Sequence, residues 1–592
     1  MCELVTLIPL PISTTLISVE SSIVLQILIL QSHLLRQTTQ TTRNILIHAM
    51  AGSTVFKNGR VFSAEDALAT TTDFHECLVV KGDKVAYVGH ANDEKVRSAE
   101  AGGAEVIDLS GRVVVPAFID SHMHLLLFGL GLAKVNLSDC KSFEDIKAAI
   151  SDRARAQPEL PRILCQQWHQ SAINGKALAS MLDDIDPRPI YIEARDCHST
   201  WCNTAALEEL RGRLEATAEE YGGDIHRDDV GKPSGLIAEN AHFGIVWPFL
   251  QTSCSISERL EAITTAINVY VESGYAGVVE MAMDNNAWDA LQLLRSQQEI
   301  PIHIAAHWAI PYSADEKQVE ARMNEAIAKH REFHPSKSPE LCIIGIKIFN
   351  DGAIGGCTAA ISHPYVGSAN LVDPVWPADA LKRTVKRAVD AGLQVAIHAI
   401  GDVAISQAVD AIAATNNPQG RQRVEHLQLA SAEDVKRVGQ LGITASIQGV
   451  HMDPIVSAAY SRIVKPHLWE RAFAFRDFLD HGACVALGTD APTARQLPLP
   501  NLYNVTTRRS AVRPELPDVV HKQYALSLSQ AIAAQTSQAA YSRFAEPWTG
   551  SLTEGKMADF LIMDMEWSPE KLLGAKVSQT WIKGRMMFQN TT

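Results

Sequence analysis

Two histidines separated by one residue, His122 and His124, stand in the segment FIDSHMHL at residues 118–125. Imidazole nitrogens are good ligands for Zn²⁺ and for other first-row divalent metals. In an extended segment, side chains two positions apart point to the same side, so both rings can face one ion while Met123 points away. One such pair is often a chance pairing or a buried hydrogen-bonded pair, so other ligands must come from the rest of the chain.

Four further groups that can bind a metal follow apolar runs later in the chain: Lys347, His398, His426 and Asp490. Each stands at or near the end of a Val- and Ile-rich run of strand length. Taken singly, each has an ordinary explanation, such as hydrogen bonding in a core. Taken together, metal-capable groups at the ends of five predicted strands are hard to obtain by chance, and they predict a shared metal site.

The apolar runs that would position these groups recur eight times, each followed by a stretch long enough for a helix. Several are apolar along their whole length, which is typical of parallel strands buried on both faces. The predicted strands span residues 113–120, 276–282, 301–309, 342–350, 393–401, 423–428, 443–449 and 484–492. Strands alternating with helices in this way predict an α/β fold of the (β/α)8, or TIM-like, barrel type, whose strands end at one common mouth.

The composition is that of a globular protein. At 592 residues the chain exceeds the usual size of one compact core, so we expect a large domain and a smaller one. The formal net charge is -14, without a basic stripe, which disfavours nucleic acid and anionic membranes as partners. The 10 cysteines form no CxxC pair, so we expect neither a thiolate zinc ribbon nor a disulfide framework, and a reducing, cytoplasmic compartment.

Residues 16–35 are apolar enough to raise the question of a membrane segment. Glu20 interrupts the run, and no Lys or Arg precedes Arg36, so the basic start of a signal peptide is missing. Each uncharged flank of Glu20 is also shorter than the ~20 residues that span a bilayer. We expect residues 1–50 to form a poorly ordered extension, with weak membrane association as the alternative.

The motifs taken together resemble the amidohydrolase superfamily, specifically the YtcJ-like branch (amidohydrolase family 3) that includes N-substituted formamide deformylases. The resemblance extends from about residue 53 to the C-terminus. It is carried by PAFIDSHMHL (116–125), GIKIFNDGAIG (345–355), AIHAIGDVAI (396–405), RVEHLQ (423–428), ALGTDAP (486–492) and GSLTEGKMADFLIMD (550–564).

The resemblance implies a metallo-hydrolase barrel that holds one or two divalent metals, with Zn²⁺ as the expected ion. By position, His122, His124 and Asp490 would bind the first metal, and His398 and His426 the second. Lys347, carboxylated by CO2, would bridge the two, because an unmodified ammonium would be repelled by both cations. A centre of one metal beside a neutral Lys347 is the alternative.

The activity implied by the resemblance is hydrolysis of a non-peptide C–N bond of a small molecule, such as an N-formyl or N-acyl amine, by metal-activated hydroxide. Asp490 would take the proton during attack and pass it to the leaving nitrogen. His451, after the seventh predicted strand, is a candidate donor to the oxyanion or the substrate. Four further residues are candidates for substrate binding, with packing or capping as an equal alternative for each: Trp168, His198, Asp351 and Gly352.

The two ends of the chain predict short strands joined by tight turns, as at 53–66 and 77–90. The resemblance implies that residues 51–112 and 546–592 form one small composite β-sandwich beside a barrel at 113–545. Residues 140–260 are too many for a plain crossover and predict an inserted lid subdomain.

Other functions stay open at this point. The same centre suits a cyclic amide hydrolase, a deaminase or a lactonase, and a barrel of this family can also be a non-catalytic element of an assembly. The expected partner is a small-molecule amide, with no nucleic acid and no clear membrane partner. The oligomeric state is open, with a homodimer as one option.

Overall fold

The computed structural model describes residues 52–66, 72–168, 170–173, 177–194, 199–216, 225–238 and 241–591. The extension predicted at residues 1–50 lies outside them. Contacts divide the chain into a first unit, which runs up to residue 123 and includes 270–282 and 301 onward, and a second unit of residues 124–269 and 283–300. Within the described ranges, no helix combines the length and the hydropathy needed to cross a bilayer.

The first unit contains an eight-stranded sheet with the order β20-β19-β18-β17-β16-β15-β14-β7. Its paired strands run parallel. The strands are β7 (Phe118–Met123), β14 (Tyr275–Met283), β15 (His303–Ala309), β16 (Leu341–Phe349), β17 (Gln394–Ala399), β18 (Arg423–His426), β19 (Thr444–Gln448) and β20 (Val485–Gly488). The N–H of Asp490 donates to the carbonyl of His122 at 2.7 Å, which joins the two ends of the sheet. The predicted barrel is confirmed.

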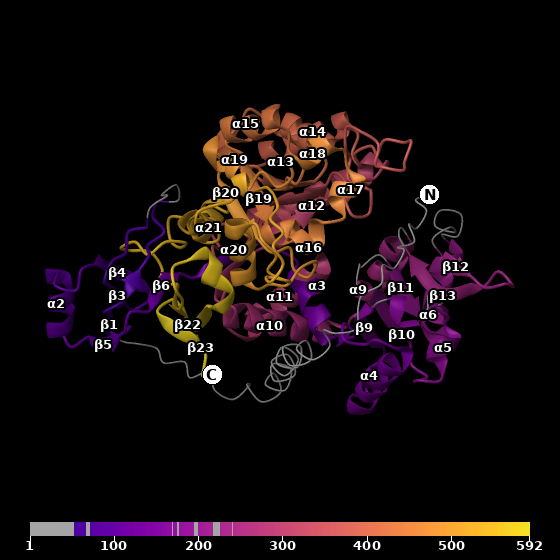
Figure 1. The fold of residues 1–592 in the computed structure, drawn as a ribbon, viewed down its shortest axis with the longest axis horizontal. Helices are drawn as coiled ribbons and strands as arrows, with labels where there is room; N and C mark the ends of the chain where they lie inside the picture. Colours follow the sequence, from indigo (N-terminus) through magenta and orange to yellow (C-terminus); the bar gives the residue numbers. More distant parts are fainter. Residues whose placement is uncertain are drawn as a thin grey trace. The chain divides into compact units, whose positions relative to one another are not determined.

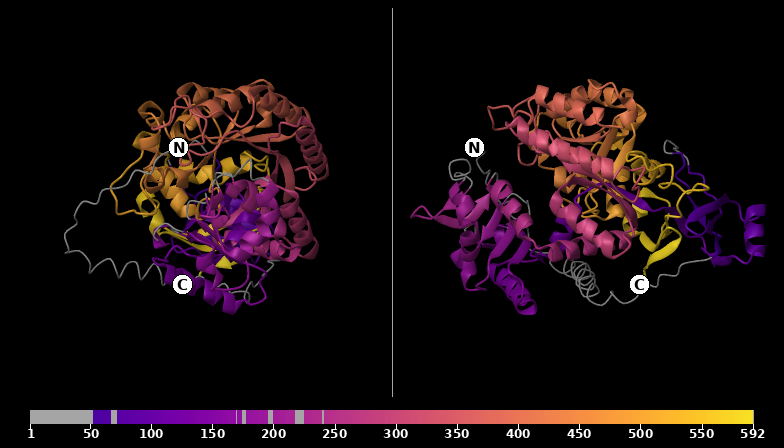
Figure 2. Two further views of the ribbon diagram at one scale, coloured as in Figure 1. Left: turned by 90° about the vertical axis from the view of Figure 1, so that its right-hand side faces the viewer. Right: turned by 180° about the vertical axis from the view of Figure 1, so that it is seen from behind.

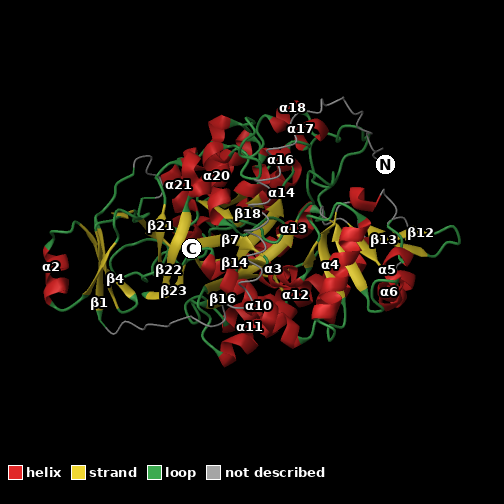
Figure 3. Cartoon of the chain, turned by 60° about the horizontal axis from the view of Figure 1, so that its bottom comes forward, coloured by secondary structure: helices red, strands yellow, loops and turns green. Residues whose placement is uncertain are grey.

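Helices contact the outer face of this sheet, as Figures 1 and 3 show. In α13 (Ala378–Asp390), the buried side chains Leu381, Val385 and Ala388 recur at three and four residues, so one stripe of the helix packs on the strands. Other helices that contact barrel strands are α12 (Glu316–Glu332), α14 (Asp402–Ala413), α15 (Ala432–Gln440), α19 (Phe475–Asp480), α21 (Leu528–Ala534) and α22 (Ser537–Tyr541).

The prediction of one strand at residues 113–120 was wrong in one respect. These residues form two strands, which belong to different sheets. β6 (Val113–Pro116) pairs with β2 (Arg60–Val61) and β21 (Phe560–Asp564), outside the barrel. The N–H of Phe118 then donates to Gly274 at 3.0 Å as the chain enters β7. Pro116 has no N–H to donate, and prolines are confined to strand edges and ends, so the ladder breaks there.

Two further sheets lie in the first unit (Figure 1). One joins β4 (Lys84–Gly89), β3 (Cys77–Lys81), β1 (Ser53–Lys57) and β5 (Glu105–Asp108). The other joins β2, β6 and β21 to β22 (Lys576–Ile582) and β23 (Arg585–Gln589), and therefore combines strands from both ends of the chain. Phe56 of β1 packs edge-on against Phe560 and Trp581, with ring centroids 5.1 and 5.2 Å apart, so the two sheets share one core.

The second unit has its own six-stranded sheet, ordered β12-β13-β11-β10-β9-β8, and its own apolar core (Figure 2). The strands are β8 (Val135–Asn136), β9 (Ile163–Trp168), β10 (Ile190–Ala194), β11 (Ser199–Cys202), β12 (Ile225–Arg227) and β13 (Pro233–Ala238). The chain reaches this unit through α3 (Leu125–Ala133), which begins directly after His124.

Candidate metal centre

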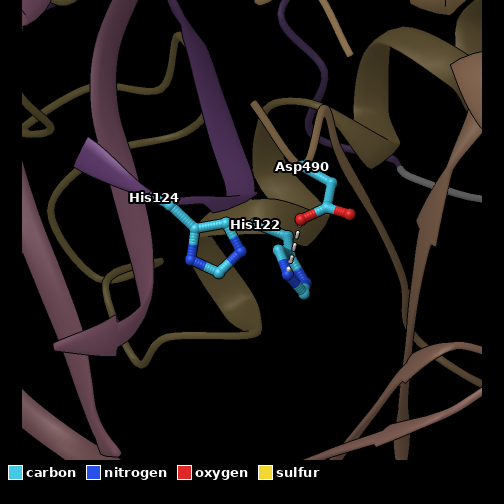
Figure 4. A group of neighbouring side chains, drawn as sticks. All are labelled: His122, His124 and Asp490. Carbon is cyan, nitrogen blue, oxygen red and sulfur yellow. Dashed lines mark ion pairs between the residues drawn. The ribbon is translucent and has the colours of Figure 1, made fainter. Parts of the chain in front are cut away.

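The structure brings His122, His124 and Asp490 together (Figure 4). His122 is near the end of β7, His124 precedes α3, and Asp490 follows β20. One potential ligand atom from each lies within 4.8 Å of the others. Nε2 of His122 is 3.2 Å from Oδ1 of Asp490, a spacing that lets both atoms bind one ion.

A second group shares the same carboxylate. His426, His451 and Asp490 also have ligand atoms within 4.8 Å of one another. Nε2 of His451 lies 3.6 Å from Oδ2 of Asp490, so the two oxygens of this carboxylate face different histidines. His451, which the sequence suggested only as a hydrogen-bond donor, therefore stands at ligand distance. The geometry supports a site with room for one or two ions around Asp490.

Neighbouring polar groups orient two of the imidazoles. Nδ1 of His122 is 2.7 Å from Oε2 of Glu425, and both side chains are buried. Nδ1 of His426 lies 2.7 Å from Oε1 of Gln448. A ring nitrogen that donates to oxygen leaves the other nitrogen unprotonated and able to bind a metal. These contacts therefore direct Nε2 of both rings toward the ion.

Arg423 holds Glu425 in its ionised form. Its Nε donates to Oε1 at 2.8 Å and its Nη2 to Oε2 at 3.3 Å, in a fully buried pair. Although burial alone would raise it, the pKa of Glu425 lies well below its usual value because of Arg423 and His122. Arg423 also donates to the carbonyl of Ser121, which fixes it to the strand that carries His122.

Burial makes the histidines good metal ligands in a second way. It lowers the pKa of His398 to about 3, with the nearby Lys347 charge acting in the same direction. It also lowers the pKa of His451, and that of His426 lies well below the usual value. Neutral imidazoles keep a lone pair, so these rings can bind a metal without first losing a proton.

Lys347 is buried at the end of β16, and burial lowers the pKa of its amine to about 8. Its Nζ has no hydrogen-bond partner among the described residues. The ring of Phe349 is 5.0 Å away, and the carboxylates of Glu425 and Asp490 act on the lysine electrostatically. Burial of an amine without a hydrogen-bond partner is energetically unfavourable. This position therefore suits an amine that is chemically modified or that contacts a metal-bound group.

His398 lies beside this cluster but outside both groups. Its ring centroid is 4.4 Å from that of His426, while its Nε2 is 3.1 Å from the carbonyl of Gly352. Asp351 is at 3.5 Å from the same nitrogen, and its carboxylate accepts hydrogen bonds from the backbone of Ile400, Gly401 and Ala360. Asp351 and Gly352 thus hold the loops around His398, and the carboxylate of Asp351 is occupied by backbone amides.

The remaining two predicted residues fall in the second unit. Trp168 is 1% exposed and belongs to that unit's apolar core, with its ring centroid 5.2 Å from that of Trp201. Packing accounts for its ring, while its Nε1 is buried without a hydrogen-bond partner among the described residues, so a role in substrate binding stays a prediction. His198 lies outside the described residues.

The sequence did not single out Arg423, Gln448 or Asp120 as parts of the site. Asp120 accepts hydrogen bonds from the N–H and hydroxyl of Thr489, at 2.9 and 2.6 Å, next to Asp490. A further signal is in the backbone, since φ is 75° at His426 and 58° at Asp490. Non-glycine residues seldom adopt this conformation, and it concentrates at functional sites.

Comparison with known proteins bears on this site. A family model described as the amidohydrolase family matches residues 105–588. The chain is 27% identical over 552 residues to the protein LONG AFTER FAR-RED 3 of Arabidopsis thaliana, covering 90% of this chain and 91% of the relative. It is 27% identical to YtcJ of Bacillus subtilis (strain 168), a protein named as an amidohydrolase, covering 84% and 92%.

Two further relatives extend the comparison. The chain is 24% identical to the N-substituted formamide deformylase of Arthrobacter pascens, covering 87% of this chain and 95% of that one. Among solved structures, an uncharacterized metal-dependent hydrolase from Pyrococcus furiosus superposes with a TM-score of 0.72 at 23% identity, over 88% of this chain and 100% of the other, which shows a shared fold. The chain belongs to the amidohydrolase family, in its YtcJ-like branch.

Proposed function

We propose that this protein is a metal-dependent hydrolase that cleaves the C–N bond of a small-molecule carboxamide, such as an N-formyl or N-acyl amine. The observation that carries the proposal is the convergence of His122, His124 and Asp490, with Asp490 shared by a second group of His426 and His451. Zn²⁺ is the first candidate for the ion, because the ligand set is rich in imidazole. The name of the Arthrobacter relative, an N-substituted formamide deformylase, supports a formamide as the first substrate to try.

A divalent metal held by His122, His124 and Asp490 would supply Lewis acidity, which favours ionisation of water and polarises a carbonyl. The residues do the rest. Asp490 accepts the proton of the attacking water and delivers it to the departing nitrogen. Thr493 donates to Oδ2 of Asp490 at 3.0 Å, which keeps the carboxylate in place. Nε2 of His451 faces the same oxygen. With a single ion held by His122, His124 and Asp490, this nitrogen would carry the ring proton and donate to the oxyanion of the substrate; with a second ion it would be a ligand instead.

Lys347 is proposed to carry a carbamate, whose two oxygens would help to hold the metal. Its unprotonated amine attacks CO2, a C–N bond forms as one C=O π bond opens, and the nitrogen releases a proton to water to leave an anionic carbamate. Its lowered pKa increases the fraction of free amine available for this step. The new oxygens would satisfy a buried group that has no hydrogen-bond partner among the described residues. A centre of one metal beside an unmodified Lys347 is the competing form, and a carbamate carbon signal in the 13C NMR spectrum of the intact protein equilibrated with 13CO2 distinguishes the two.

The test is hydrolysis by purified protein of matched N-formyl, N-acetyl and cyclic amides, together with metal analysis. We expect one to two equivalents of metal per chain, loss of hydrolysis on chelation, and recovery when Zn²⁺ is returned. Turnover by protein stripped completely of metal would overturn the proposal. Hydrolysis of lactones or release of ammonia from amines, with no amide cleaved, would assign the same centre to a lactonase or a deaminase.

Two variants and a control separate chemistry from folding. His122→Ala removes a ligand, and Asp490→Asn removes the proton acceptor, so each should lower kcat by at least about 10²-fold. Asp480→Asn is the matched control, because Asp480 lies at the exposed end of α19 and pairs with the helix neighbour Arg476. A metal-loaded protein that cleaves none of the substrates, with or without these changes, would favour a non-catalytic role in an assembly.

A further inference from the structure

Three of the largest fully buried side chains are arginines: Arg423, Arg508 and Arg543. A guanidinium stays protonated inside proteins, and a buried charge is strongly unfavourable unless an opposite charge or a full set of hydrogen bonds compensates it. Arg423 has such compensation from Glu425, described above. Arg508 does not.

Arg508 follows α20 (Pro498–Thr507) and uses only one of its nitrogens. Its Nε donates to the carbonyl of Val520 at 2.8 Å. Its Nη1 and Nη2 are both buried and have no hydrogen-bond partner among the described residues. The guanidinium lies over the ring of Phe475, with Cζ 5.1 Å from the centroid, so one face of it is covered by carbon. Burial lowers its pKa to about 9, and the group that opposes this shift is Tyr524, not a carboxylate.

The neighbours of Arg508 add further donors. The hydroxyl of Tyr524 accepts from Nη1 of Arg471 at 3.5 Å, so its own proton can be donated to another group. Arg471 pairs with Asp477 through Nη2 at 2.8 Å, while its Nε is buried without a partner in the described part of the chain. His521 interacts electrostatically with Arg508, and its Nε2 is also buried without a hydrogen-bond partner among the described residues. Asp477 thus compensates Arg471, and the exposed Glu470 acts electrostatically on His521, whereas Arg508 has no carboxylate partner among the described residues.

We propose that Arg508, Arg471 and Tyr524 form a buried binding site for a small inorganic anion such as chloride. The anion accepts hydrogen bonds from Nη1 and Nη2 of Arg508 and from the hydroxyl of Tyr524, and it supplies the negative charge that Arg508 lacks. None of these residues belongs to either group of metal ligands.

The position of the site gives it a structural consequence. Arg508 closes the C-terminal end of α20, and Asn501 of this helix donates to the carbonyl of Gly488 at 2.9 Å and accepts from the N–H of Val450 at 3.1 Å. Gly488 and Val450 are close in sequence to Asp490 and His451. We therefore expect the bound anion to stabilise the helix that supports these two segments.

The experiment uses the full chain and bromide in place of chloride. Crystals soaked in bromide should show an anomalous peak within hydrogen-bond distance of Nη1 or Nη2 of Arg508. In solution, the midpoint of thermal unfolding should rise by a few degrees and saturate as gluconate is replaced by chloride at constant ionic strength. The proposal would be overturned by a wild-type crystal with a water or a carboxylate at these nitrogens. It would also be overturned if the midpoint of thermal unfolding did not change when gluconate is replaced by chloride.

Arg508→Met should abolish both the peak and the chloride response. Arg513→Met is the matched control, because Arg513 is exposed on the same segment and pairs with Glu515, and it should leave both unchanged. If Arg508→Met does not fold, Tyr524→Phe decides the matter. This change keeps the ring and removes one donor, so it should raise the chloride concentration at half-saturation several-fold; an unchanged half-saturation would remove Tyr524 from the site and contradict the proposal as stated.

Discussion

At the scale of single residues, the candidate centre is shaped by side chains that are not themselves candidate ligands. Glu425 fixes the proton of His122 on Nδ1, and Arg423 keeps Glu425 ionised. Such a buried pair gains little stability by itself, because both charges lose their hydration. The pair instead fixes the orientation of His122, because it leaves Nε2 as the nitrogen that faces Asp490.

Glu425→Gln should therefore weaken metal binding without removing a ligand. The amide of glutamine can donate to Nδ1 of His122, which moves the ring proton to Nε2, where it blocks coordination. We expect the metal affinity to fall by about 10- to 100-fold. Competition for the metal against a coloured chelator measures this directly, independently of any substrate.

Glu433→Gln is the control for this variant, because Glu433 lies on the exposed face of α15, eight residues further on. It should retain the metal as tightly as the wild type. If Glu425→Gln also retains it, with circular dichroism unchanged, then the contact with His122 is a packing feature and does not set the tautomer.

The sequence indicated the kinds of ligand, but not which side chain contacts which. The histidines, Lys347 and Asp490 were predicted because polar residues at the ends of apolar runs are conspicuous. The contact between Glu425 and His122 joins residues 303 positions apart, and no local pattern encodes it. The left-handed backbone at His426 and Asp490 was equally hidden, because such a conformation is imposed by surrounding tertiary contacts.

At the scale of elements, the decisive feature is the junction between the first and last barrel strands. Asp120 of β7 binds across it to the backbone and hydroxyl of Thr489, next to β20. The same carboxylate accepts from the hydroxyl of Tyr270 at 3.0 Å and from the N–H of His122 at 3.2 Å. One buried side chain therefore links the segments that carry His122 and Asp490.

Two variants should measure how much these hydrogen bonds of Asp120 contribute to the free energy of unfolding. Tyr270→Phe removes one hydrogen bond and should lower the free energy of unfolding by about 1 kcal/mol. Asp120→Ala leaves several buried donors without a partner and should cost about 3 kcal/mol or more. Denaturant unfolding of the metal-free protein compares the two without a contribution from metal loss. Similar small effects from both would mean that the backbone hydrogen bond between Asp490 and His122 suffices to close the barrel.

The elements themselves were largely predictable. Fully apolar runs such as residues 393–401 predicted buried parallel strands, and β17 lies there with five of its six residues buried. The run at 113–120 misled because its two halves are equally apolar while they belong to different sheets. Hydrophobicity reports that a segment is buried, but not which neighbour buries it, so only Pro116 carried a local sign of the break.

At the scale of the whole first unit, the base of the barrel meets the strands from the chain ends through buried polar groups. His303 begins β15, and its Nδ1 accepts a hydrogen bond from Arg543. Its ring packs edge-on against Trp548, 5.0 Å between centroids. Close by, Asp559 accepts from the hydroxyl of Thr549 and from the N–H of Lys583, each at 2.8 Å. This end of the barrel is thus a second polar core, remote in sequence from the metal ligands.

That core should make stability depend on pH in a definite direction. Burial holds the pKa of His303 well below its usual value, and the charges of Arg543 and Lys583 add to the effect. As the pH falls below about 6.5, the unfolded chain binds a proton at this histidine and the folded chain does not, so the free energy of unfolding falls by about 1.4 kcal/mol per pH unit. The contribution is fully present above about pH 7 and is lost progressively toward the folded-state pKa.

His303→Gln isolates this term, because the glutamine oxygen can still accept from Arg543 but cannot titrate. The variant should be less stable than the wild type at about pH 8, where the wild type keeps its ring packing and has no proton to bind. Toward about pH 5 the difference should shrink by about 1.4 kcal/mol per pH unit below 6.5. Denaturant unfolding of metal-free wild type and variant across this range measures the difference. A gap that stays constant with pH would show that His303 titrates alike in the folded and unfolded chain, and that the base of the barrel admits water.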